Sequence, residues 1–197
     1  MLEAVASPHQ VLAWFLRMLP KSFFEELKQD LEIVENSCIY TLMVTTWLMV
    51  LQRLSGNGTL ATAVSQPAAG CGRELLEPCR QVRDGRISVN TGAFSLARGR
   101  MRVQAAWRIA MRTFLGLLEV APDSGLRNRL FMLDGSSVRL VHTPELVKIY
   151  PPASNQHGES HWPVLKVAVM HHVATALAMP PEWGPMYGPE AMSEQEM

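Results

Sequence analysis

RLFMLDGSSVRLV, residues 129–141, is the stretch that decides the fold class. It is rich in apolar residues that favour strands, and it predicts a strand or a hairpin. Two further apolar runs, at 164–171 and 173–179, predict two more strands. Before residue 121, apolar residues recur mostly at helical spacing. The sequence therefore predicts an α+β protein in which helices come first and strands follow.

Several segments ahead of this stretch predict helices, because apolar spacing, capping residues and helix breakers delimit them. They are 9–19, 22–35 with Ser22 as N-cap, 39–54, 59–64 with Thr59 as N-cap, 74–82 and 93–118. The segment 39–54 is apolar nearly all round, so we expect it to be buried. We expect a helical domain at residues 1–120, a linker at 121–125 and a second domain at 126–197.

The second domain contains three predicted strands and no clear helix, which is too little to close a core. The final run, SEQEM (193–197), resembles the start of a helix, with Ser193 as N-cap and Glu196 three residues later. We therefore expect this domain to be truncated.

Composition narrows the class of protein. The chain has 197 residues, of which 48% are apolar, so a wholly disordered chain is excluded. Three cysteines without CxxC spacing give no disulfide framework, and residues 1–10 lack a signal-peptide pattern, so we expect a cytoplasmic protein. The most apolar run, 38–51, has 14 residues, fewer than the ~20 that span a bilayer, so we expect no membrane partner.

The zero net charge conceals a basic segment. Residues 73–112 carry nine arginines and no lysine against three acidic side chains, a net charge of +6. Because a planar guanidinium binds phosphate oxygens in a bidentate way, the segment is a candidate phosphate-binding surface. A solvated helix face is the alternative interpretation.

Asp134 is the candidate for chemistry, since it lies in an apolar run beside Gly135. A carboxylate buried in a strand needs a partner or a metal ion. Spacing alone favours a simpler interpretation, an Asp-Gly turn in a hairpin. The two serines that follow do not form a GxSxG motif, so a serine hydrolase is not supported.

Five of the six histidines lie between residues 142 and 172. His157 and His161 are four residues apart, but Gly158 and an irregular loop argue against a helix that presents both to one metal ion. The simpler interpretation is that these histidines are polar loop residues.

Three longer stretches carry a resemblance to a known family. They are YTLMVTTWLMVLQRLSGNGTLATAVSQ (40–66), ISVNTGAFSLARGRM (87–101) and LDGSSVRLVHTPELVKIYPPASNQHGESHWPVLKVAV (133–169). The chain resembles the N-terminal part of bacterial DDE-type transposases of the insertion sequence 4 group. This resemblance implies an RNase H-like catalytic domain, in which two aspartates and a glutamate hold two Mg²⁺ ions for DNA strand cleavage and transfer.

By this resemblance, Asp134 is the first catalytic and metal-binding carboxylate, and the chain begins but does not complete the RNase H-like domain. Arg98, Arg100 and Arg102 are the expected contacts to double-stranded DNA at transposon ends. The second aspartate and the glutamate would lie beyond residue 197, so we expect an incomplete Mg²⁺ site and no activity from this chain alone. His171-His172 departs from the His-Asp that relatives often carry.

Other interpretations stay open beside this one. The chain is alternatively a non-catalytic DNA-binding fragment that competes with or regulates a full-length transposase, or a decayed product that folds poorly. A second transposase copy, in a homodimer, is a further partner that the resemblance allows.

Overall fold

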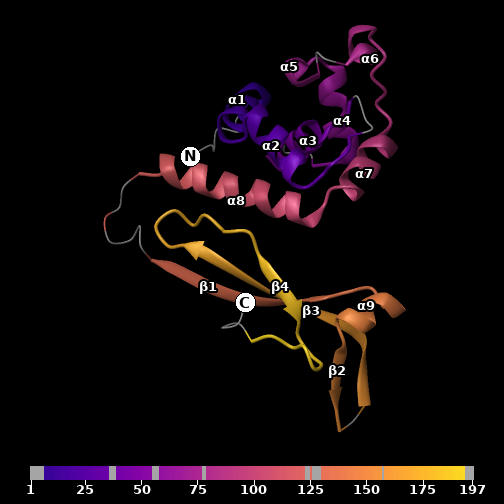
Figure 1. The fold of residues 1–197 in the computed structure, drawn as a ribbon, viewed down its shortest axis with the longest axis vertical. Helices are drawn as coiled ribbons and strands as arrows, with labels where there is room; N and C mark the ends of the chain where they lie inside the picture. Colours follow the sequence, from indigo (N-terminus) through magenta and orange to yellow (C-terminus); the bar gives the residue numbers. More distant parts are fainter. Residues whose placement is uncertain are drawn as a thin grey trace. The chain divides into compact units, whose positions relative to one another are not determined.

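The computed structural model describes residues 7–35, 39–54, 58–76, 79–122, 125, 130–156 and 158–193. It contains helices and an antiparallel sheet, so the expected α+β class is confirmed. Contacts divide the chain into two units, Met1–Arg112 and Thr113–Met197, which we call the helical unit and the strand unit (Figure 1). The domain limits expected at 120 and 126 stay a prediction.

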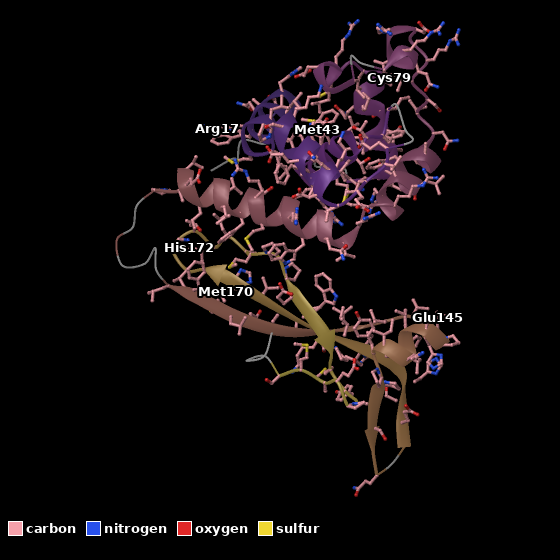
Figure 2. All side chains as sticks on the ribbon, viewed as in Figure 1. Arg17, Met43, Cys79, Glu145, Met170 and His172 are labelled. Atoms are coloured by element: carbon pink, nitrogen blue, oxygen red, sulfur yellow. The ribbon has the colours of Figure 1, made fainter. Side chains whose placement is uncertain are left out.

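The helical unit is built around one central helix. Its elements are α1 (Pro8–Met18), α2 (Lys21–Asp30), α3 (Leu42–Leu54), α4 (Leu60–Ala68), α5 (Arg73–Leu76), α6 (Arg80–Arg83), α7 (Thr91–Gly99) and the first part of α8 (Val103–Val120). Contacts join α3 to α1, α2, α4, α5 and α7. Trp47 and Leu48 on α3 are completely buried, which confirms the expectation of a buried helix at this position. Figure 2 shows Met43 of α3 among the side chains of this unit.

Local capping explains where several helices begin. Ser7 accepts a hydrogen bond from the Gln10 amide at the start of α1, and Thr59 does the same for α4, as expected. The start expected at Ser22 is wrong. There α2 begins at Lys21, after an extended Pro20 and without a side-chain cap.

The helix expected at 59–64 continues to Ala68 as α4, and three other expected helices also differ from those observed. The expected helix 22–35 ends at Asp30, and Glu32 beyond it has a positive φ of 50°. The segment 93–118 is divided into α7 and α8, because α7 ends at Gly99, a residue that favours helix termination. The segment 74–82 contains two short helices, α5 and α6, with residues 77 and 78 between them outside the described ranges.

The strand unit is organised around one long strand. Its elements are β1 (Phe131–Arg139), α9 (Pro144–Ile149), β2 (Pro152–Asn155), β3 (Gly158–His172) and β4 (Glu182–Pro185). All three other strands pair with β3 in antiparallel fashion (Figure 1). The register of β1 runs without interruption from Phe131 opposite His172 to Arg139 opposite Val164.

This register overturns the Asp-Gly turn that spacing favoured. Asp134 lies opposite Val169 and Gly135 opposite Ala168, so both residues continue the strand. The physical reason is the length of β3, which offers ladder partners along the whole of β1 and leaves no second half-strand for a hairpin.

The chain after β3 also differs from expectation. Residues 173–179 do not form a strand: they contain a turn with Ala176 at a φ of 57° and a single bridge between His171 and Ala178. The last strand is instead β4, inside a Pro/Gly-rich tail. Pro185 is tolerated there because β4 pairs with one neighbour only in the described sheet.

The expected loop at 142–162 contains α9, β2 and the start of β3. The expected helix start at Ser193 depends on residues 194–197, which lie outside the described ranges. None of the helices in the described parts of the chain is long and apolar enough to cross a membrane.

Candidate functional site

The three arginines that the resemblance implies in DNA contact lie at one corner of the helical unit. Arg98 is in the last turn of α7, Arg100 is its C-cap, and Arg102 immediately precedes α8. Asn90 positions this helix, because its side-chain oxygen accepts a hydrogen bond of 2.7 Å from the Gly92 amide. We call the segment 98–102 the arginine corner.

The members of the arginine corner differ in what they contact. The guanidinium of Arg102 donates a hydrogen bond to the carbonyl of Leu31. The guanidinium of Arg98 lies 5.8 Å from the centroid of the Phe94 ring, a cation–π distance. Arg100 is exposed and has no ion pair within the described ranges. Arg100 is therefore the member whose charge is most available to a ligand.

Two further arginines of the basic segment are paired with acids. Arg108 Nη1 lies 2.8 Å from Asp30 Oδ2, and Arg80 Nε lies 3.7 Å from Asp84 Oδ2. Arg73, Arg83, Arg86 and Arg112 have no acidic partner in the part of the chain that the structure describes. Most of the positive charge of the segment 73–112 is thus not neutralised by acidic side chains among the described residues.

A cleft of about 710 Å³ opens beside the arginine corner. Its walls come from residues 33–35 and 39–40, from the start of α3, from the segment 81–90 and from α7 with the residues that follow it. Arg86 and Arg100 bring positive charge to it, and Glu35 brings a carboxylate. Sequence reasoning did not select Arg86 or Glu35, since nothing local marks residues 51 positions apart as neighbours in space.

The charge of Glu35 is compensated within the unit. Its Oε2 lies 3.1 Å from Lys28 Nζ, and its other carboxylate oxygen accepts a hydrogen bond from the Leu42 amide. Partial desolvation lowers the pKa of Lys28, but the hydrogen bonds and charges of Glu25 and Glu35 outweigh it, so that the pKa lies above its usual value. Burial raises the pKa of the Tyr40 phenol in the cleft wall.

Asp134 belongs to the strand unit and is exposed in the middle of β1. Because cross-strand partners share a face, Val169 lies beside it, and His171 occupies a diagonal position on the same face. No hydrogen bond or ion pair engages the Asp134 carboxylate within the described residues. The strand thus presents a solvated carboxylate on a largely apolar face.

These surroundings do not fit a Mg²⁺ site by themselves. Mg²⁺ requires several hard oxygen ligands in near-octahedral geometry, and Asp134 supplies one carboxylate. Among the described residues, no group of three or more His, Cys, Asp or Glu side chains is arranged to hold a metal ion. We therefore derive no catalytic step from Asp134.

The histidines have structural contacts. The rings of His142 and His161 are stacked with centroids 4.4 Å apart. His172 is completely buried at the end of β3, where its Nδ1 lies 2.8 Å from Thr175 Oγ1 (Figure 2). Its Nε2 has no hydrogen-bond partner among the described atoms. His157 lies outside the described ranges.

Comparison of the chain with models of protein families, with curated proteins and with solved structures gives no match.

Proposed function

We propose that this chain binds double-stranded DNA through the arginine corner and carries, at Asp134, one carboxylate of a DDE-type transposase centre. The observation that carries the proposal is the corner itself. Arg98 and Arg100 belong to the stretch 87–101, which resembles the family, and Arg102 follows it directly. The three lie together there, and none of them is paired with an acid within the described residues. Arginines in this state supply the bidentate phosphate contacts that dominate DNA affinity.

The position of Asp134 supports the transposase part of the proposal. The carboxylate is exposed, unpaired and on the first strand of an antiparallel sheet, which is compatible with the start of an RNase H-like domain. By the resemblance, the other two carboxylates belong to later elements. We therefore propose that these 197 residues bind DNA without cleaving it.

A salt titration tests the DNA-binding part. Fluorescence anisotropy with a labelled short duplex should give an affinity that falls steeply with salt, because phosphate contacts release counterions. Arg100→Ala should weaken binding and reduce the slope of log K against log salt by about 0.9, the value for one lost phosphate contact.

Arg53→Ala is the matched control, since Arg53 is exposed on α3, outside the basic segment, and has no ion pair in the described ranges. It should leave the slope unchanged. Binding that is insensitive to salt, or equal losses from the two variants, would contradict the proposal.

A nicking assay tests the role of Asp134. Supercoiled DNA with Mg²⁺ or Mn²⁺ should stay intact in the presence of the chain. Nicking that disappears with Asp134→Ala would show that the chain assembles a working site, for example between copies, and would refute the proposal that it binds without cleaving. Binding without nicking would favour the alternative role, a fragment that occupies transposon ends in competition with a full-length transposase.

A further inference from the structure

The cleft beside the arginine corner combines apolar walls with positive charge. Its apolar lining includes Val34, which is 81% exposed, and Leu96, which is 61% exposed. Its volume of about 710 Å³ lies within the ~300–1,000 Å³ of ligand pockets. Large apolar side chains exposed in a concave site lose contact with water when a ligand covers them, which favours binding.

The charged groups of the cleft are not equivalent. Arg86 and Arg100 are exposed and have no acidic partner among the residues that the structure describes. Glu35 is already engaged by Lys28 and by the Leu42 amide. The charge left for a ligand is therefore positive, and two guanidinium groups suit a phosphate.

We propose that this cleft receives one unpaired nucleotide of a DNA strand, with the base against the apolar wall and the phosphate on Arg86 and Arg100. The inference rests on the proposed function and adds a substrate class to it: DNA with a single-stranded end rather than a fully paired duplex. Gln81 and Ser88, which also line the cleft, provide hydrogen-bonding groups for a base edge.

An acidic peptide is the competing occupant, and the chemistry favours the nucleotide. A nucleotide carries an anion and a flat apolar surface within one residue, and the cleft is lined by both guanidinium groups and apolar side chains. The surrounding segment 73–112 has a net charge of +6, so the remaining phosphates of a DNA strand also meet positive potential.

The experiment compares two DNA probes on the full chain. One is a blunt duplex, and the other is the same duplex with a short single-stranded overhang that contains 2-aminopurine. We expect the overhang probe to bind about tenfold more tightly, because a base that covers the apolar wall removes apolar surface from water. The 2-aminopurine fluorescence should change on binding, because the base leaves its stacked environment.

Two matched pairs of variants test the cleft. Arg86→Ala should abolish the preference for the overhang. Arg83→Ala removes the same charge from an exposed residue that does not line the cleft, so it should weaken both probes alike. Leu96→Ser should also abolish the preference without any change of charge. Leu54→Ser, at a 55% exposed leucine of α3 outside the cleft, should retain it.

Circular dichroism establishes that each variant is folded. The inference is overturned if the wild-type chain binds both probes with equal affinity, or if Arg83→Ala loses the preference as Arg86→Ala does. In either case, salt-dependent binding of the duplex leaves the proposed function standing. Displacement of the overhang probe by an acidic peptide, but not by a single-stranded oligonucleotide, assigns the cleft to a peptide and overturns it as well. If neither probe binds, the proposed function fails and the inference fails with it.

Discussion

The two units differ in how their side chains are buried. The helical unit contains a packed core in which Trp47, Leu48 and Phe94 are completely inaccessible to solvent. Along β1 of the strand unit, by contrast, every residue except Gly135 is exposed. Burial of apolar side chains stabilises the first unit, whereas main-chain hydrogen bonds define the second.

The exposed side chains of β1 lie on both faces of the sheet. Met132 and Val138 alternate with Phe131 and Leu133, and all four are at least 42% exposed. An antiparallel sheet usually keeps one face apolar and covered and leaves the other polar. The comparison teaches that truncating a side chain should cost much more in α3 than in β1, which the following substitutions test.

The largest effect is expected from Trp47→Ala in the core of the helical unit. Removing a completely buried tryptophan should lower the free energy of unfolding of that unit by about 3–5 kcal/mol. Hydrogen exchange measured by mass spectrometry should show that the substitution accelerates exchange more in α3 and its neighbours than in β1 and β3. Equal acceleration in both units would mean that they unfold together, and the contrast between them would be lost.

Gly72→Ala tests the same core through the backbone. Gly72 has a φ of 70°, and an added Cβ would lie 2.5 Å from the Trp47 Cη2. Overpacking should add about 1–3 kcal/mol to the ~1–2 kcal/mol of left-handed strain.

Gly85→Ala is the control for that substitution, because its φ of 68° is similar and nothing lies within 4 Å of the added Cβ. Gly85→Ala should therefore lower the free energy of unfolding only by the left-handed strain. Denaturant titration of both variants measures the difference, and equal losses would contradict the contact between Gly72 and Trp47.

A matched pair of leucines compares the two units directly. Leu48→Ala, at a completely buried position, should cost about 2–5 kcal/mol, as for other core leucines. Leu133→Ala, at a position 47% exposed, should cost about 1 kcal/mol or less, because little apolar surface leaves water there. Thermal unfolding of the two variants is the measurement, and comparable losses would show that β1 is covered in solution.

The smallest effect is expected from Lys28→Gln on the surface of the helical unit. The raised pKa of Lys28 stabilises the folded state at pH values below its unfolded value of 10.5, and this contribution is lost as the pH rises through the folded value. The difference in Tm between wild type and variant should therefore be constant near neutrality and shrink above about pH 10.5. Lys21→Gln, at an exposed lysine without an ion pair in the described ranges, is the control. A difference that does not change with pH would contradict the role of the acidic partners.

Local signals predicted much of the helical unit. The apolar run at 39–54 and the cap at Thr59 act over a few residues, and α3 and α4 lie where these signals indicate. The Ser7 cap of α1 was found only in the structure. The same signals failed at 173–185, where the chain turns at Ala176 and forms β4 in a Pro/Gly-rich tail. Pairing with β3 overrides the local preference there, and no short window of sequence contains that partner.

The candidate site was also predictable only in part, because local sequence identifies its arginines but not the partners that packing brings to them. The stretch 87–101 and the arginine content of 73–112 identify the arginine corner without a structure. They do not identify the long-range contacts of these arginines. Arg102 of the corner donates to the carbonyl of Leu31, 71 residues away, and Arg108 of the basic segment pairs with Asp30, 78 residues away. Arg86 and Glu35 at the cleft were missed because they come together only when α2, α3 and α7 pack.

By itself, the amino-acid sequence determined that a helical region precedes the first strand and that positive charge is concentrated in one segment, because spacing and composition are local properties. Tertiary structure alone decided that Asp134 and Gly135 continue a strand, since the ladder partners that replace a turn are Val169 and Ala168. It also decided that the Arg102 guanidinium donates a hydrogen bond to the Leu31 carbonyl, because this acceptor is remote from Arg102 in the chain.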